Sequence, residues 1–346
     1  MTQRHFPTAA APHLPPARDV ASLMRDVLLA LTPGIAAHVW FFGPGILLQI
    51  ALAALFALAA EALVARWRRQ RVKRLLGDYS ALVTAVLFAL SVPPLAPWWI
   101  ALTGMASAIW LVKHAYGGLG YNRFNPAMAG FAIVLISFPL TMSQWLAPAP
   151  LNAGGAELSE IIKAIGLGQL PAAAHWDAIS SATPLGLLRS GRAQNLLVSE
   201  VRLDPVFGDF GGHGWEWIAN WYLAGGLWLL YRRVINWRVP VATLGTTLLL
   251  TLPFYLIDPA AHPLPLQHVF SGALVLGAFF IATDPVSGAS TPAGRLWFGV
   301  GVAVLTLAIR RWGNYPDGVA FAVLTMNAFA PLIDRYCRPR IYGERR

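Results

Sequence analysis

The chain has 346 residues, of which 56% are hydrophobic and only 12% are charged. A soluble domain carries roughly 25% charged residues, so this composition excludes a soluble enzyme and a disordered chain and predicts a polytopic helical membrane protein. Lys and Arg exceed Asp and Glu by 10, which in a membrane protein indicates cytoplasmic loops rather than nucleic-acid binding. The single cysteine, Cys337, cannot form an intrachain disulfide or hold an iron–sulfur cluster alone.

The apolar runs predict about ten membrane spans, because each span needs about 20 apolar residues. They are expected at 24–42, 45–65, 79–95, 98–114, 126–145, 215–232, 239–257, 267–283, 295–310 and 317–334. The segment between the fifth and sixth spans is not apolar and is too long for a simple connector. The expected organisation is a tail at 1–23, a first five-helix half at 24–145, a loop at 146–214, a second half at 215–334 and a tail at 335–346.

The distribution of Lys and Arg predicts how the chain is oriented in the membrane. If the N-terminus is cytoplasmic, 20 of the 26 Lys and Arg residues fall on the inner side, with a dense group at 66–74. Positively charged residues are retained on the cytoplasmic side of membrane proteins. Both termini are therefore expected in the cytoplasm, and the loop at 146–214 is expected outside.

A weak internal repeat relates the two halves. Ala81-Leu82-Val83 recurs as Ala273-Leu274-Val275 at an offset of 192, and 131–135 resembles 321–324 at an offset of 190. Spans three and eight therefore correspond, as do spans five and ten. Two halves of five spans each run in opposite directions across the bilayer, and such an inverted repeat tends to build a central site at the midplane.

Three polar segments could carry chemistry. The first, 117–130, combines glycines that permit close backbone approach to a ligand with Asn125-Pro126, which alone would also fit an ordinary helix start. The second, 282–291, contains Asp284 and could be a helix stop followed by a turn. The third, 177–186, contains a Thr-Pro pair that could be only a turn.

Few ionisable residues fall within the expected spans. Glu61 lies one turn from Arg66 and is expected to pair with it or to reach the interface. His114 is expected to be interfacial rather than a ligand, and no zinc spacing, nucleophile elbow or P-loop is present in the sequence.

At these three segments the sequence resembles a known family. The residues at 117–127 (GGLGYNRFNPA), at 181–183 (SAT) and at 282–287 (ATDPVS) occur together in a chain of ten expected spans, as in the RnfD/NqrB family. Members of that family belong to the Rnf electron-transport complex or to the sodium-translocating NADH:quinone reductase. The resemblance covers about 24–343. It implies one polypeptide of a bacterial inner-membrane complex that works with the other subunits of that complex.

The resemblance also implies two flavins. In the family, the Thr of a Ser-Gly-Ala-Thr-like motif is esterified to the phosphate of FMN by an external flavin transferase. The matching residues here are Ser180, Ser181, Ala182 and Thr183, with Ser181 where Gly is usual. Ser287-Gly288-Ala289-Ser290 is similar but has Ser at the acceptor position and lies on the other side of the expected topology. An unlinked riboflavin is implied near Asn122 and Asn125, and the cofactor-binding residues expected with them are Gly118, Gly120 and Asp284.

The function that the resemblance implies is electron transport across the membrane. The whole complex would couple electron transfer between NADH and ferredoxin or flavodoxin to movement of Na⁺ or H⁺. Two alternatives stay open from the sequence: the related quinone-reductase protein, and a channel or transporter with an inverted repeat and no redox role.

Overall fold

A computed structural model describes residues 18–152, 156–315 and 317–338. Within these ranges the chain is helical, with only two isolated β-bridges. The helices are α1 (Val20–Phe42), α2 (Gly45–Trp67), α3 (Val72–Leu76), α4 (Ser80–Ala89), α5 (Trp98–Ala106), the π-helix η1 (Ser107–His114), α6 (Pro126–Ser137), α7 (Pro139–Met142), the 3₁₀-helix η2 (Ala149–Leu151), α8 (Leu158–Leu167), α9 (Ala173–Ile179), α10 (Pro184–Ala193), α11 (Val198–Val201), α12 (Trp215–Tyr231), α13 (Arg238–Ile257), α14 (Pro265–Phe270), α15 (Leu274–Leu276), the π-helix η3 (Gly277–Ile281), α16 (Pro292–Trp312) and α17 (Val319–Tyr336). The expected all-helical fold is confirmed.

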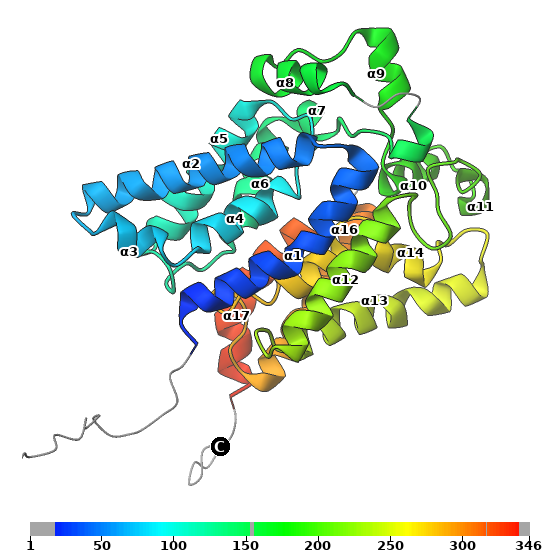
Figure 1. Cartoon of the computed structure of the whole chain (residues 1–346). Helices are drawn as coiled ribbons and strands as arrows, with labels where there is room; N and C mark the ends of the chain where they lie inside the picture. The colour runs from blue at the N-terminus through cyan, green and yellow to red at the C-terminus, as the bar shows by residue number, and fades with distance from the viewer. Residues whose placement is uncertain (1–17, 153–155, 316, 339–346) are drawn as a thin grey trace, which may run out of the picture.

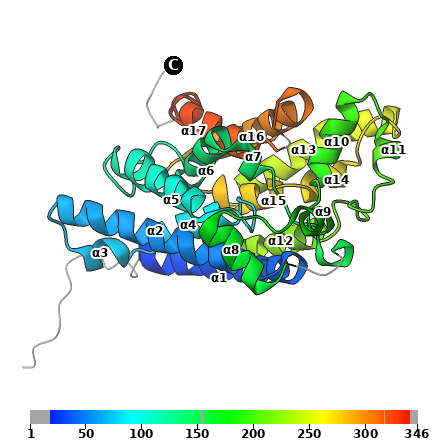
Figure 2. The same ribbon diagram turned by 90° about the horizontal axis from the view of Figure 1, so that it is seen from above.

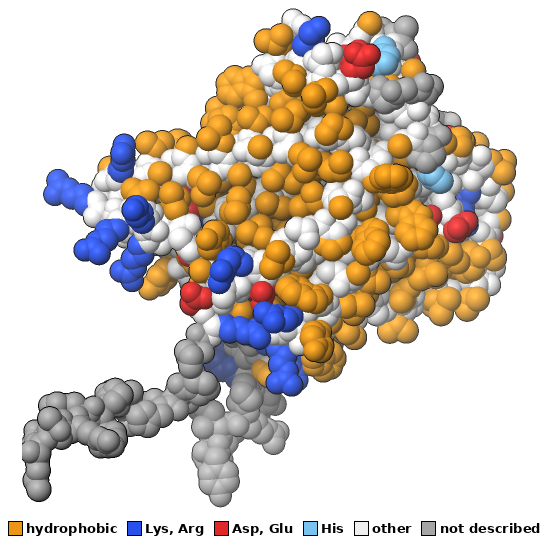
Figure 3. Space-filling model, viewed as in Figure 1, with side chains coloured by type: hydrophobic (Ala, Val, Ile, Leu, Met, Phe, Trp, Pro, Cys, Tyr) orange, Lys and Arg blue, Asp and Glu red, His pale blue; other side chains and the backbone are white. Residues whose placement is uncertain are grey.

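The described helices have the length and composition of a polytopic membrane protein. Four of them, α1, α2, α13 and α16, are long and apolar enough to cross a bilayer, and shorter apolar helices such as α4 and α6 accompany them. Figure 3 shows a face covered mainly by hydrophobic side chains, with Lys and Arg gathered along its lower left border. We call this border the basic end; the C-terminal end of α2, α3 and the C-terminal end of α12 lie on this side in Figure 1, and their exposed Lys and Arg residues are Arg66, Arg68, Arg69, Arg71, Lys73, Arg74, Arg232 and Arg233.

The opposite end of the molecule carries the segment between the two halves. Helices α8 to α11 cluster there in Figure 1, and we call it the loop end. The start of α1 and the end of α17 both lie toward the basic end, so the described chain begins and finishes on one side. Helices of the two halves pack together: α1 lies along α12, where a Cβ at Gly225 would collide with the Ala30 carbonyl, and α17 contacts α6.

Three of the expected spans are interrupted, which corrects the sequence prediction; the one expected at 126–145 divides at Phe138 into α6 and the short α7. The span expected at 79–95 is represented by α4, which ends at Ala89 before an irregular, proline-containing stretch at 90–97. The span expected at 267–283 divides into α14, α15 and η3, with Gly272 between them at a φ of 69°. Both stretches remain apolar, so hydropathy alone does not reveal that the helix stops within them.

The breaks at 90–97 and around Gly272 fall in corresponding spans of the two halves but not at corresponding positions, because at an offset of 192 Gly272 aligns with Ser80 and 90–97 aligns with 282–289. These spans are the third and eighth expected spans, the pair related by the offset of 192 in the sequence. Figure 2 shows α4 and α15 in the middle of the molecule, with the long helices arranged around them. Interrupted helices in corresponding spans of the two halves mark the binding site in many transporters built from inverted repeats.

Side chains from neighbouring helices satisfy the backbone at both interruptions. The Gln49 amide of α2 donates to two carbonyl oxygens of the first interruption. The buried Arg310 guanidinium of α16 donates to the carbonyls of His268 and Ser271 at the second. Because a bilayer offers no water to exposed peptide groups, these two side chains make non-helical backbone tolerable there.

Candidate functional site

Two cavities lie along the interrupted segments. The basic-end cavity has a volume of about 690 Å³, and its lining includes Ser80, Lys113, Asn122, Asn125, Asp284 and Arg295. The loop-end cavity has a volume of about 170 Å³, and its lining includes His38, Trp145, Thr183, Trp215, Tyr222 and Tyr315. The structure therefore brings Asn122, Asn125 and Asp284 together and places Thr183 at a separate cavity.

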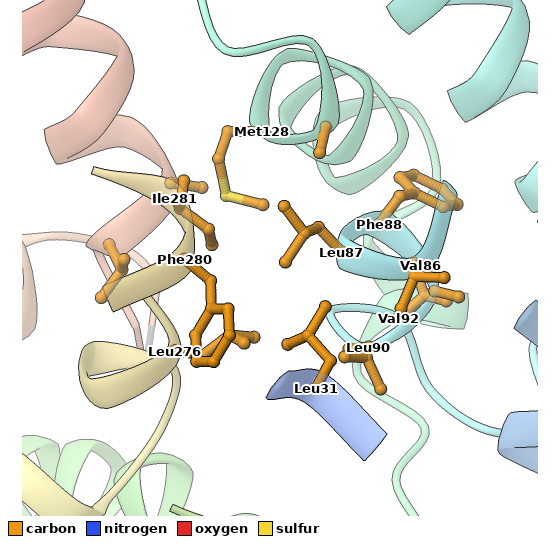
Figure 4. Close-up of a cluster of buried hydrophobic side chains, with 14 of the residues drawn as sticks. Leu31, Val86, Leu87, Phe88, Leu90, Val92, Met128, Leu276, Phe280 and Ile281 are labelled. Carbon is orange, nitrogen blue, oxygen red and sulfur yellow. The ribbon is translucent and has the colours of Figure 1, made fainter. Parts of the chain in front are cut away.

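A layer of buried hydrophobic side chains separates the two cavities. In Figure 4, side chains of α4, α15 and η3, including Leu87, Leu276 and Phe280, converge on one another. Leu87 and Phe280 also line the basic-end cavity, while Leu276 lines the loop-end cavity. Each interrupted segment thus contributes to both cavities and to the layer between them.

The two predicted asparagines occupy one wall of the basic-end cavity. Asn125 is the N-cap of α6, and its Oδ1 accepts the Met128 N–H at 3.1 Å, as the Asn-Pro sequence predicts. Asn122 donates its amide N–H to the Phe124 carbonyl at 3.1 Å. The Asn122 Oδ1 is buried and has no hydrogen-bond partner among the described residues. An orphaned buried acceptor beside a large cavity is a group that a bound ligand could satisfy.

Asp284 lies in the loop that follows η3, outside the helical spans. Its carboxylate accepts hydrogen bonds from the Ser287 hydroxyl at 2.7 Å and the Val286 N–H at 3.1 Å. Burial raises the pKa of the Asp284 carboxyl above its usual value, although these hydrogen bonds act in the opposite direction. The Asp284 carboxylate therefore holds this loop in place through hydrogen bonds and also lines the cavity.

Asn327, which was not identified from the sequence, joins the segment containing Asn122 and Asn125 to the segment containing Asp284. Asn327 of α17 accepts the backbone N–H of Asn125 at 3.0 Å and donates to the Ser287 carbonyl at 3.0 Å. Asn327 is buried. Its position in an apolar helix was the signal that could have identified it, because a buried amide in a membrane span needs hydrogen-bond partners.

Gly118 and Gly120 have a backbone role in the structure. Their φ angles are 104° and 91°, a region that favours glycine, so both shape the turn before Asn122. Neither glycine is among the described residues that line the basic-end cavity, although Leu119, which lies between them, does line it. A direct contact of either glycine with a flavin stays a prediction.

Glu61 does not pair with Arg66, contrary to the sequence prediction. Its carboxylate is buried and accepts from the Lys113 ammonium, and the His114 Nε2 lies 3.5 Å from the same oxygen. Lys113 and His114 end the π-helix η1, and both are buried rather than interfacial. Lys113 also donates to the Ser80 hydroxyl at 2.7 Å, which places a hydrogen-bonded lysine on the cavity wall.

Thr183 begins α10 and lines the loop-end cavity. Its Oγ1 caps the helix by accepting the Gly186 N–H at 3.2 Å. Among the described residues, none accepts a hydrogen bond from the Thr183 hydroxyl. The hydroxyl therefore lies at the positive end of a helix with its own proton uncommitted, where a phosphate would be favoured electrostatically.

The three residues before Thr183 are held against the start of the loop. Ser180 pairs with Leu146 in an isolated β-bridge, and the Ser181 N–H donates to the Trp145 carbonyl at 3.1 Å. The Ser181 hydroxyl donates to the Ala182 carbonyl at 3.1 Å. These contacts fix the approach of the chain to Thr183, while Thr183 alone among the four lines the cavity.

Two buried polar atoms face the loop-end cavity without partners. The His38 Nε2 and the Tyr222 hydroxyl are buried, and neither has a hydrogen-bond partner among the described residues. Both side chains belong to the cavity lining together with Thr183. An apolar cavity with few unsatisfied polar groups is typical of a site for an aromatic ligand with polar edges.

The similar segment at Ser290 and Thr291 is arranged differently. Thr291 caps α16 by accepting the Gly294 N–H at 3.1 Å, but its hydroxyl donates to Asp334 at 2.9 Å. The Ser290 hydroxyl also donates to Asp334, at 2.8 Å. Both hydroxyl protons are therefore committed to a carboxylate of α17.

Comparison with known proteins places the chain in a family. The family model described as "NQR2, RnfD, RnfE family" matches residues 7–343. Similar curated proteins are named as the subunit designated D of an ion-translocating oxidoreductase complex. The one from Aeromonas salmonicida is 48% identical over 99% of both chains. The one from Vibrio vulnificus is 45% identical over 98% of this chain and 99% of the relative, and the one from Salmonella paratyphi A is 45% identical over 99% of both.

These matches extend over nearly the whole chain and include the three segments from which the resemblance was inferred. The family prediction is confirmed: this chain belongs to the NQR2, RnfD, RnfE family.

Proposed function

We propose that this chain is the membrane flavoprotein subunit of an Rnf-type ion-translocating oxidoreductase complex and that it carries electrons from one face of the membrane to the other. Its partners are the other subunits of that complex, the surrounding lipid and the external flavin transferase that modifies it. The complex couples electron transfer to movement of Na⁺ or H⁺. The names of the relatives support membership in such a complex.

The observation that carries the proposal is the pair of cavities along the two interrupted segments. One cavity contains Thr183, and the other contains Asn122, Asn125 and Asp284. Two redox groups held there would lie on opposite sides of one hydrophobic layer. The linings of both cavities offer hydroxyl, amide and aromatic groups, which suit organic ring cofactors.

The Thr183 site suits a phosphate ester of FMN. The hydroxyl has an uncommitted proton, and the N-terminus of α10 favours the remaining phosphate charge. The Oγ1 keeps its lone pairs after esterification and can still cap the helix. His38 and Tyr222 offer polar atoms to the edges of a ring in the adjacent cavity. When bound, the flavin supplies one- and two-electron chemistry, and the protein supplies position and electrostatics.

The basic-end cavity suits an unlinked, neutral riboflavin. Its volume of about 690 Å³ falls in the range of small-molecule sites. Asn122 and Asn125 supply amide groups, which can pair with the donors and acceptors of the ring or with the ribityl hydroxyls. Asn327 fixes the relative position of the Asn125 and Ser287 backbones, which keeps both walls of this cavity in place.

The covalent flavin is tested by replacing Thr183 with Val, which keeps the shape of the side chain but cannot form the ester. Wild-type chain made with the flavin transferase should give a fluorescent band on a denaturing gel. Its intact mass should exceed the sequence mass by one FMN minus water. Thr183→Val should lose both signals while still inserting in the membrane.

Thr291→Val is the matched control, because Thr291 is also a Thr-Pro helix cap. It should retain the fluorescence and the added mass. A label that persists in Thr183→Val, or that disappears in Thr291→Val, would assign the flavin to another residue. Absence of any covalent flavin from wild-type chain made with the transferase would refute the flavoprotein proposal at this site.

The unlinked flavin is tested by extraction. Wild-type protein and Asn122→Ala/Asn125→Ala protein of matched thermal stability are denatured, and the released riboflavin is measured against protein. We expect a clear loss of riboflavin in the double variant. Equal riboflavin in the two proteins would leave Asn125 with only its helix-capping role, worth about 1 kcal/mol.

A further inference from the structure

The basic-end cavity has one cationic side chain that is buried. Four charged residues line it: Lys113, Arg233, Asp284 and Arg295. The Lys113 side chain is 2% exposed, whereas Arg233 is exposed and lies at the mouth of the cavity. A charge that water does not surround acts on its neighbours far more strongly than a solvated one. Lys113 is therefore the cation with the strongest influence inside this cavity.

The position of Lys113 is set by a chain of polar contacts. Glu61 of α2 accepts from the ammonium, and the Ser80 hydroxyl accepts from it at 2.7 Å. The Ser80 hydroxyl in turn donates to the Asp78 carboxylate at 2.6 Å. Lys113 and Ser80 line the cavity, and Glu61 is not among the described residues that do so. The ion pair is thus oriented with its positive end toward the cavity.

Burying this ion pair costs desolvation free energy, which the packing of the side chains does not offset by itself. Two buried charges often stabilise a protein no better than hydrophobic residues of the same size, so a buried ion pair is weak evidence for a stabilising role. The π-helix η1, which ends with Lys113 and His114, is a geometry often found at functional sites. Both features indicate that the pair acts on whatever occupies the cavity.

We propose that the Glu61–Lys113 ion pair raises the reduction potential of the flavin held in the basic-end cavity, through the positive end that Lys113 presents to it. This inference rests on the proposed function, because it needs a flavin in that cavity. A flavin ring becomes more negative as it takes up electrons, and a nearby fixed positive charge favours the reduced ring over the oxidised one. Lys113 then sets the reduction potential of the flavin and does not itself accept or donate electrons.

The experiment measures the midpoint potential of the extractable flavin in full-length chains carrying Thr183→Val, so that no covalent flavin titrates. Lys113→Gln is compared with Arg233→Gln, which removes the same charge from the solvated mouth of the same cavity. We expect a downward shift of the potential in Lys113→Gln and a much smaller shift in Arg233→Gln. Riboflavin content is measured on each preparation.

Removing one partner of a buried ion pair leaves the other charge uncompensated and is strongly destabilising, so a second variant guards against a Lys113→Gln chain that does not fold. The double variant Glu61→Gln/Lys113→Gln removes both charges and leaves two amides that can pair. It too should show a lowered potential, because the positive end is gone. An unchanged potential in a double variant that retains its riboflavin overturns the inference. Parent protein without extractable flavin would instead overturn the proposed occupant of the cavity.

Discussion

Thr183 and Thr291 show how one local sequence can serve two purposes. Each is a helix N-cap followed by proline, and each Oγ1 accepts the N–H of a glycine three residues later, at 3.2 and 3.1 Å. They differ in what receives the hydroxyl proton. Thr291 donates to Asp334 of α17, whereas among the described residues none accepts from Thr183. The tertiary contact, rather than the cap motif, separates a structural hydroxyl from one available for modification.

The two caps also lie at opposite ends of the molecule. Thr183 lines the loop-end cavity, while Ala289 and Arg295 on either side of Thr291 line the basic-end cavity. If the predicted topology holds, an enzyme confined to one side of the membrane reaches only one of the two threonines. The two threonines thus differ both in the hydrogen bonding of their hydroxyl groups and in the end of the molecule at which they lie. Different measurements test these two differences.

The largest expected effect is an all-or-none difference in accessibility. In a Cys337→Ser background, Asn195→Cys should react with an impermeant thiol reagent in intact cells, and Gln70→Cys should not. Both positions are exposed in the structure, so only the membrane distinguishes them. Mass spectrometry of the labelled chains gives the result. The reverse pattern would place Thr183 on the cytoplasmic side and remove the topological reason for choosing it.

The next effect concerns stability. Asp334 accepts hydrogen bonds from the backbone and the hydroxyl of both Ser290 and Thr291. Hydrogen bonds to a charged group contribute about 1.5–3 kcal/mol, so Asp334→Ala should lower the free energy of unfolding by about 2–3 kcal/mol. Denaturant titration in detergent checks this. The covalent flavin should stay on Thr183 and not appear on the freed Thr291, since location still excludes it.

A smaller effect is the energetic coupling between each cap and Asp334. Thr291→Val and Asp334→Ala remove the same hydrogen bond, so their effects on unfolding should fall short of additivity by about 1 kcal/mol. Thr183→Val and Asp334→Ala should be additive within about 0.3–0.5 kcal/mol, because the residues share no contact. Two double-mutant cycles measured on unmodified protein give both numbers. Equal coupling energies in the two cycles would contradict the claim that Asp334 holds the hydroxyl of Thr291 and not that of Thr183.

The smallest effect is expected at Ser181, which stands where the family usually has glycine. Its hydroxyl contacts only the neighbouring Ala182 carbonyl among the described residues, and its φ is not in the left-handed region. Ser181→Gly should therefore leave the stoichiometry of covalent flavin unchanged, as measured by intact mass. A marked increase in labelling would show that Ser181 hinders the transferase.

Much of the fold could be predicted because apolar length and charge are local properties. The all-helical class and the Asn125 cap follow from composition and from the Asn-Pro sequence. The interruptions at 90–97 and around Gly272 could not be predicted from hydropathy, since both stretches stay apolar. The repeat does pair the two spans that contain them, at an offset of 192.

The site was predictable only where its chemistry lies in one segment. Thr183 stands out within its own motif, whereas the partner of Glu61 is Lys113, far along the chain, and local spacing suggested Arg66 instead. Asn327 likewise acts through a contact between α17 and the two polar segments. Such contacts depend on how distant helices pack, which spacing in a single sequence does not encode.

The two interruptions differ in the order in which their supports are synthesised. Gln49 precedes the stretch it supports, so its amide is already in place when 90–97 leaves the ribosome. Arg310 follows the stretch it supports, so the carbonyls of His268 and Ser271 wait for α16. The backbone at the second interruption can therefore receive these hydrogen bonds only after the penultimate helix has been made. A chain that ended before Arg310 would leave these two carbonyls without their guanidinium donor, in a bilayer that offers no water to replace it.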